Sequence, residues 1–112
     1  MLSIEIIENG DNAIVNLIGI INFETTMKLR DSLSKFREYT YKNVILNLAN
    51  VRLIDSSGLG LLVAAKNTFE RHDKKFKLCG ISPIVKKIFI QTNLIVYFDV
   101  YADVNEALNV ID

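Results

Sequence analysis

The chain has 112 residues, half of them hydrophobic, which predicts one domain over residues 1–112 with a single core of ordinary stability. Its 13 basic and 13 acidic side chains cancel, so we expect no general attraction to nucleic acid or to an anionic bilayer. No apolar run approaches the roughly 20 residues that a membrane helix needs, and Met1 to Glu8 do not resemble a signal peptide, so we expect a cytoplasmic protein that inserts into no membrane.

The first half of the chain predicts two strands, a helix and a third strand. Residues 2–8 and 13–18 are rich in β-branched side chains, and the turn-forming Asn-Gly-Asp-Asn between them predicts an antiparallel hairpin. Over residues 24–39 apolar side chains recur at helical spacing, which predicts a surface helix. The nearly continuous apolar run 44–48 is typical of a central strand in a largely parallel sheet, because both of its faces are covered.

The second half of the chain alternates helix and strand. Apolar positions over residues 59–69 and 83–89 have helical spacing, and each of these segments is followed by a β-rich run, at 76–79 and at 95–101. Residues 103–111 predict a short last helix. The order ββαβαβαβα predicts an α/β fold, a mixed five-strand sheet that is mostly parallel after the N-terminal hairpin, with right-handed crossovers and about four helices.

One segment, Ile54-Asp55-Ser56-Ser57-Gly58-Leu59-Gly60, joins the end of a hydrophobic strand to the start of an apolar-striped helix. Its carboxylate and hydroxyls therefore stand at a helix N-terminus, where Asp55 or Ser56 can cap free amides. Gly58 and Gly60 cost a helix about 1 kcal/mol each relative to alanine, which suggests that a docking protein or a phosphate comes close to the backbone. From the residues alone a structural role is the simpler account, in which the glycines let the helix pack tightly on the sheet.

The run Asp55-Ser56-Ser57-Gly58-Leu59-Gly60 resembles the signature of bacterial anti-sigma factor antagonists, which are STAS-domain proteins. The similarity extends through the opening hairpin and includes Gly19, Asn47-Leu48, Ile81-Ser82-Pro83 and Glu106-Ala107-Leu108. In that family the serine after the signature aspartate is phosphorylated by a partner that is both anti-sigma factor and serine kinase, and a phosphatase reverses the modification. The resemblance implies a STAS fold and a non-enzymatic switch: the unmodified protein captures the kinase and frees a sigma factor.

The resemblance also assigns the site residues. It implies that Ser56 is phosphorylated and that the partner is contacted by Asn22, Asp55, Ser57, Gly58, Leu59 and Gly60. A phosphoserine carries about −1.5 to −2 charges, so beside Asp55 it adds repulsion and desolvation cost to a docking surface. The helix N-terminus stabilises the same phosphate within its own chain. We therefore expect Ser56 to be exposed at the helix start, and we expect no metal and no cofactor.

One stretch departs from the family pattern. Many members carry Gly-Glu-Leu/Ile-Asp after the second strand, with the acidic residues beside the phosphorylated loop, whereas this chain has Gly19-Ile20-Ile21-Asn22. Asn22 can hydrogen-bond but supplies no charge, so we expect it to limit phosphorylation of Ser56. Ile20 and Ile21 either enlarge an apolar contact at that edge or belong to a buried strand end.

A second function stays open, in which the chain is a STAS module that is not phosphorylated and serves as a fixed subunit or small-ligand sensor of a larger assembly.

Other kinds of site have little support in the sequence. Asp55 after a strand is also typical of a receiver domain, but no acidic pair follows the first strands, and Val63 stands where a dinucleotide site needs a further glycine. His72 lies in a polar stretch typical of a solvated helix end, and without a second histidine or a Gly-x-Ser-x-Gly elbow a Ser-His-Asp hydrolase has no basis. Cys79 is expected to be a small buried hydrophobe.

Overall fold

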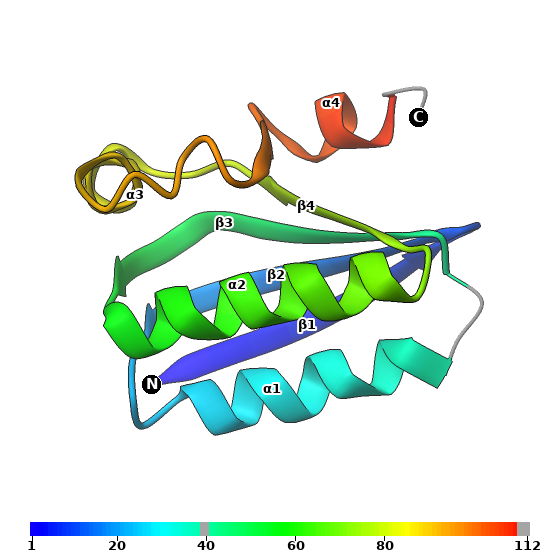
Figure 1. Ribbon diagram of the computed structural model, residues 1–112, viewed down its shortest axis with the longest axis horizontal. Helices are drawn as coiled ribbons and strands as arrows, with labels where there is room; N and C mark the ends of the chain where they lie inside the picture. Colours follow the sequence, from blue (N-terminus) through cyan, green and yellow to red (C-terminus); the bar gives the residue numbers. More distant parts are fainter. Residues whose placement is uncertain (39–40, 110–112) are drawn as a thin grey trace.

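A computed structural model describes residues 1–38 and 41–109 of the chain. The elements, in chain order, are β1 (Leu2–Asn9), β2 (Asn12–Ile21), α1 (Thr26–Ser34), the 3-10 helix η1 (Lys35–Glu38), β3 (Asn43–Ile54), α2 (Ser56–Arg71), β4 (Lys75–Cys79), α3 (Pro83–Gln91), β5 (Asp99–Tyr101) and α4 (Val104–Leu108) (Figure 1). The five strands form one sheet in the order β1-β2-β3-β4-β5, in which β1 and β2 are antiparallel and the other neighbours are parallel. This confirms the predicted mixed sheet and its opening hairpin.

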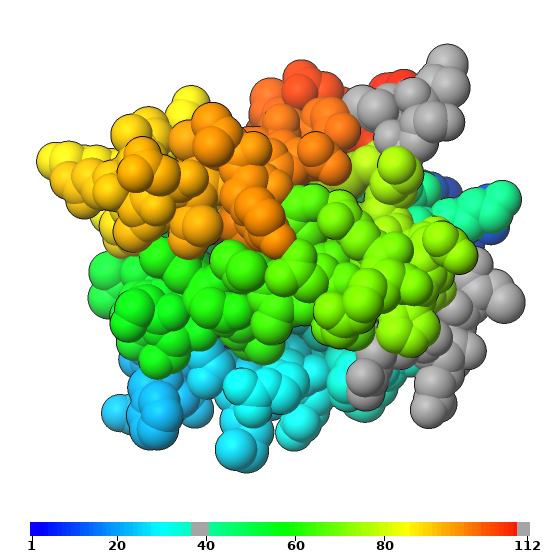
Figure 2. Space-filling model, viewed as in Figure 1, coloured from blue at the N-terminus to red at the C-terminus, as the bar shows by residue number. Residues whose placement is uncertain are grey.

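The crossover connections decide which face of the sheet each helix covers. Every crossover moves one strand in the same direction across the sheet, so right-handed connections place α1, α2 and α3 on one face. Figure 1 shows α2 in front of β2 and α1 beyond β1 at the edge of the sheet, and in Figure 2 the three helices hide most of the sheet. On the other face, Ala107 of α4 packs against Ile45 and Cys79. The sheet thus has helices on both faces.

β3 is the central strand, as predicted from its apolar run. Val44, Ile45 and Leu46 are all fully buried, because successive side chains point to opposite faces and helices cover both. The strand is longer than residues 44–48 and continues to Ile54. The added residues pair with the second half of β2, with two register irregularities on the way, and they bring the end of β3 beside the end of β2.

Three predicted boundaries differ from the structure. The helix predicted over 24–39 begins at Thr26 and tightens into η1, since the residues before it form a separate turn; residues 39 and 40 lie outside the described residues. The last helix is Val104–Leu108, and residues 110 and 111 of the predicted span are likewise not described.

The third difference lies in the β-rich run predicted over 95–101. Only Asp99–Tyr101 form a strand, because the backbone N–H groups of Leu94 and Ile95 both donate to the carbonyl of Phe89 at the end of α3. These hydrogen bonds turn the chain instead of extending it. Leu94 and Ile95 are therefore partly buried against the core without joining the sheet, whereas Val96 is exposed.

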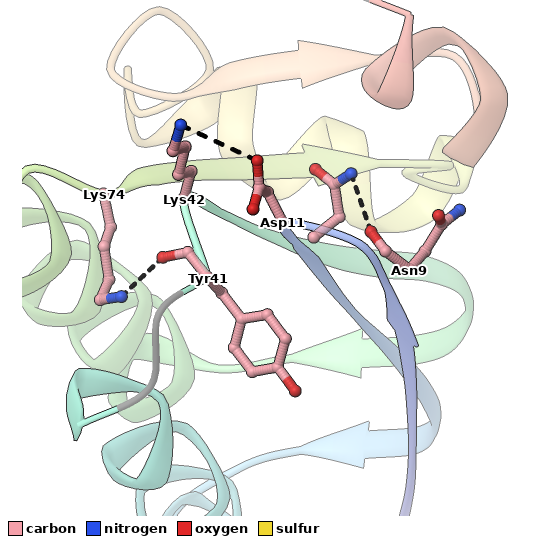
Figure 3. Close-up of polar contacts among 6 residues, drawn as sticks. Asn9, Asp11, Tyr41, Lys42 and Lys74 are labelled. Carbon is pink, nitrogen blue, oxygen red and sulfur yellow. Dashed lines mark hydrogen bonds and ion pairs between the residues drawn. The ribbon is translucent and has the colours of Figure 1, made fainter.

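At the end of the sheet where β3 and β4 begin, polar contacts tie neighbouring segments together (Figure 3). The backbone N–H of Lys42 donates to the carbonyl of Asp11 at 2.7 Å, and the two side chains form an exposed ion pair at 3.8 Å. Lys74 is buried, and its Nζ donates to the carbonyl of Tyr41 at 2.6 Å. The hairpin turn and the entries to both strands are thereby held together.

Candidate functional site

Ser56 is exposed and is the first residue of α2, as predicted. The preceding Asp55 is the N-cap of the helix, and its Oδ1 accepts a hydrogen bond from the backbone N–H of Gly58 at 3.0 Å. The backbone N–H of Asp55 donates to the carbonyl of Ile21 at the end of β2, also at 3.0 Å. Asp55 is therefore held both through its side chain and through its backbone N–H, and this fixes the position of the next residue, Ser56.

The second carboxylate oxygen of Asp55 reaches a different segment. Its Oδ2 accepts a hydrogen bond from the backbone N–H of Phe23 at 3.1 Å, although the two residues are 32 positions apart. One carboxylate thus joins the first turn of α2 to the loop that follows β2. Since both oxygens of Asp55 are engaged by backbone amides, this side chain holds the loop in place beside Ser56.

Asn22 organises the same loop from within. Its Oδ1 accepts hydrogen bonds from the backbone N–H groups of Glu24 at 3.0 Å and Thr25 at 3.1 Å. The hydroxyl of Thr25 in turn donates to the carbonyl of Ile20 at 2.8 Å. Asn22 is therefore linked to the start of α2 through this loop, in which the backbone N–H of Phe23 is bound by Asp55. An aspartate at this position would offer the same acceptors to the same amides.

The two glycines differ in their surroundings. Gly58 is buried, and a Cβ there would lie 2.7 Å from Cγ2 of Ile21 and 2.7 Å from Cγ1 of Ile54, so this glycine allows α2 to pack closely on the strand ends. Gly60 is exposed, and a Cβ there would meet open space. The tight-packing account of the two glycines therefore applies to Gly58 and not to Gly60.

The remaining residues assigned from the resemblance are placed as follows. Ser57 is half-buried, and the side chain of Leu59 lies in the main hydrophobic core. Ile21 is fully buried, which favours the buried strand end, while Ile20 remains partly exposed. Of the α2 residues assigned to partner contact, Ser57 is partly exposed and Gly60 is exposed, so these two contribute surface close to Ser56.

Phe23 was not predicted as a site residue, and its aromatic side chain is exposed in the loop bound by Asp55. Met27, one turn further along α1, is also exposed. The available signal was a large apolar residue placed directly before a predicted surface helix and outside its apolar stripe. Phe23 is a neighbour of the site through its backbone, while its ring points to solvent.

The other candidate groups do not form a second site. His72 is exposed at the end of α2, with its Nδ1 2.8 Å from the carbonyl of Thr68. Burial, with the nearby Asp103 as a smaller cause, raises the pKa of the Cys79 thiol to about 11.

Within residues 1–38 and 41–109, no three His, Cys, Asp or Glu side chains lie close enough together to hold a metal ion. In the same part of the chain, no helix has the length and apolarity needed to span a membrane.

Comparison with known proteins adds sequence and structural relatives. A model of the STAS domain matches residues 3–107. An anti-sigma-B factor antagonist of Staphylococcus epidermidis is 33% identical over 93 residues, which cover 83% of this chain and 86% of that protein. Among solved structures, an anti-sigma factor antagonist from Mycobacterium paratuberculosis has a TM-score of 0.87 at 18% identity and covers 96% of this chain and 92% of its own. The unphosphorylated anti-sigma factor antagonist SpoIIAA has a TM-score of 0.81 at 20% identity, over 98% of this chain and 100% of its own, and both structures show a shared fold.

Proposed function

The chain belongs to the STAS domain family, and we propose that it is an anti-sigma factor antagonist whose binding is switched off by phosphorylation of Ser56. In this proposal the unmodified chain binds an anti-sigma factor that is also a serine kinase, and a sigma factor is released. A phosphatase that acts on the phosphoserine restores binding. The observation that carries the proposal is the exposed Ser56 hydroxyl at the start of α2, next to the fixed carboxylate of Asp55.

The geometry supports a switch that acts on the interface and leaves the fold intact. Ser56 makes up the first position of a 16-residue helix, so the dipole and amides of the first turn favour an added phosphate. Asp55 is held beside it by two backbone amides and cannot turn away without losing them. A docking partner would therefore meet two adjacent negative groups in the modified chain and one in the unmodified chain.

The test is a binding titration with the purified anti-sigma factor of the organism that makes this chain. Ser56→Asp should weaken binding by about tenfold or more, which is about 1.4 kcal/mol, because it places a permanent charge in the interface. Ser56→Ala should bind as the wild type does. Asn105→Asp is the matched control, because it adds the same charge at an exposed position of α4, on the other face of the sheet.

Three outcomes separate the alternatives. Loss of affinity in Ser56→Asp alone, with an unchanged melting temperature, supports the switch. Equal affinity of Ser56→Asp and the wild type contradicts a role for charge at this position. If the wild-type chain itself does not bind the anti-sigma factor, the function as a fixed subunit or small-ligand sensor is favoured instead.

A further inference from the structure

Two large hydrophobic side chains are exposed at the start of α1. Phe23 is 78% exposed and Met27 is 65% exposed. A turn with one helical hydrogen bond connects them, because the N–H of Thr26 donates to the carbonyl of Asn22, four residues earlier. Residues four apart on such a turn are neighbours on its surface. Phe23 and Met27 therefore form one apolar patch, called here the Phe23–Met27 patch.

The backbone under this patch is fixed. The N–H of Phe23 is bound to Asp55, and its carbonyl accepts a hydrogen bond from the hydroxyl of Thr26 at 3.0 Å. Asn22 binds the two amides that follow Phe23. An aromatic side chain on an ordered backbone loses little freedom when a partner covers it, so it is suited to act as an anchor in an interface.

The patch is also continuous with the site. One hydrogen bond joins the backbone N–H of Phe23 to Asp55, the N-cap of α2, and Ser56 directly follows Asp55. In Figure 1, α1 and α2 begin at the same end of the sheet. A partner large enough to cover Ser56 would therefore reach the start of α1 as well.

We propose that the Phe23–Met27 patch is the apolar anchor through which the anti-sigma factor binds, with Phe23 entering an apolar pocket of that partner beside Ser56. This rests on the function proposed above and specifies its partner surface. Lys28, the residue after Met27, donates from its Nζ to the carbonyl of Leu2 at 2.7 Å, and Glu24 and Asp31 are exposed acids near the patch. The contribution of the patch to affinity should depend on the apolar area that the partner buries.

The experiment compares alanine variants of the full chain in calorimetric titrations with the purified anti-sigma factor. Phe23→Ala should weaken binding by about tenfold or more, and Met27→Ala by a few-fold, because interface aromatics dominate binding energy. Ile90→Ala and Val96→Ala are matched controls at 52% and 86% exposure, near the end of α3 and in the turn that follows it. They should change the affinity by less than about twofold, since surface truncations away from an interface are near neutral.

Phe23→Leu guards against an effect on folding. It keeps an apolar side chain on the same backbone, and it should retain more of the affinity than Phe23→Ala at an equal melting temperature. If Phe23→Ala binds as tightly as the two control variants while the wild type binds well, the anchor is wrong and the function proposed for Ser56 stands. If the wild type does not bind at all, the proposed function fails, and this inference fails with it.

Discussion

The two ends of the sheet use their polar groups in different ways. Where β3 and β4 begin, Lys74 and Lys42 are turned toward the chain itself, one on the carbonyl of Tyr41 and one on Asp11 (Figure 3). Where β2 and β3 end, Asp55 binds two backbone amides and leaves the side chains of Ser56 and Phe23 facing solvent. The second end combines an ordered backbone with outward-facing groups, which is what reversible modification and docking require.

Among substitutions at the two ends of the sheet, removal of the Asp55 carboxylate should lower the free energy of unfolding the most. Asp55→Ala deletes the cap of α2 and the link to Phe23, so we expect a loss of about 2–3 kcal/mol in the free energy of unfolding, the sum of a cap and a second hydrogen bond. Urea denaturation measures it. Asp103→Ala is the matched control, because the Asp103 side chain caps α4 through one hydrogen bond, from the N–H of Glu106. Equal losses in the two variants would show that the link to Phe23 adds no stability.

The two glycines of α2 should respond to alanine in opposite directions. Gly58→Ala should destabilise the fold by about 1–3 kcal/mol, because its Cβ would overlap the side chains of Ile21 and Ile54. Gly60→Ala should stabilise it by about 0.5–1 kcal/mol, since the added methyl group meets open space and restrains the unfolded chain. Thermal unfolding of both variants provides the measurement. Destabilisation by Gly60→Ala would contradict the open space that the structure has around Gly60.

Much of this end could be predicted from local sequence. A helix N-terminus capped by Asp55 or Ser56 was predicted from the residue types at the strand-to-helix junction, and the cap is Asp55. The exposure of Ser56 was expected from the family resemblance. The separate roles of Gly58 and Gly60 could not be predicted, because they depend on which strand ends lie under the helix. Helical periodicity predicts which face of the helix a residue occupies, but it does not predict which atoms pack against that residue.

The contact between Asp55 and Phe23 lies beyond local rules for a further reason. It needs the end of β2 to meet the end of β3, and their register shifts twice between Asn16 and Ile20. A single-residue slip would turn the side chains of one strand to the other face. Only the paired sheet fixes how far Phe23 is from Asp55.

A smaller effect is expected when the missing charge of the family pattern is restored. Asn22→Asp should keep both loop hydrogen bonds, since a carboxylate accepts them as the amide oxygen does. Phosphorylation of Ser56 should become faster by a few-fold, because one charge-assisted hydrogen bond in a solvated loop contributes modestly. Timed mass spectrometry with the cognate kinase and ATP measures the rates. Equal rates would show that Asn22 does not limit the reaction.

The smallest effect should come from the exposed ion pair at the opposite end. Lys42 and Asp11 have side chains that are 75% and 63% exposed, so water and salt screen their attraction. We expect Lys42→Ala and Asp11→Ala each to change stability by less than about 1 kcal/mol, with a coupling of about 0.2–1 kcal/mol in the double-mutant cycle. The backbone hydrogen bond from Lys42 to Asp11 survives both substitutions. Urea denaturation at low and high salt is the measurement, and a coupling much larger than this would mean that charge pairing, and not backbone hydrogen bonding, closes this end of the sheet.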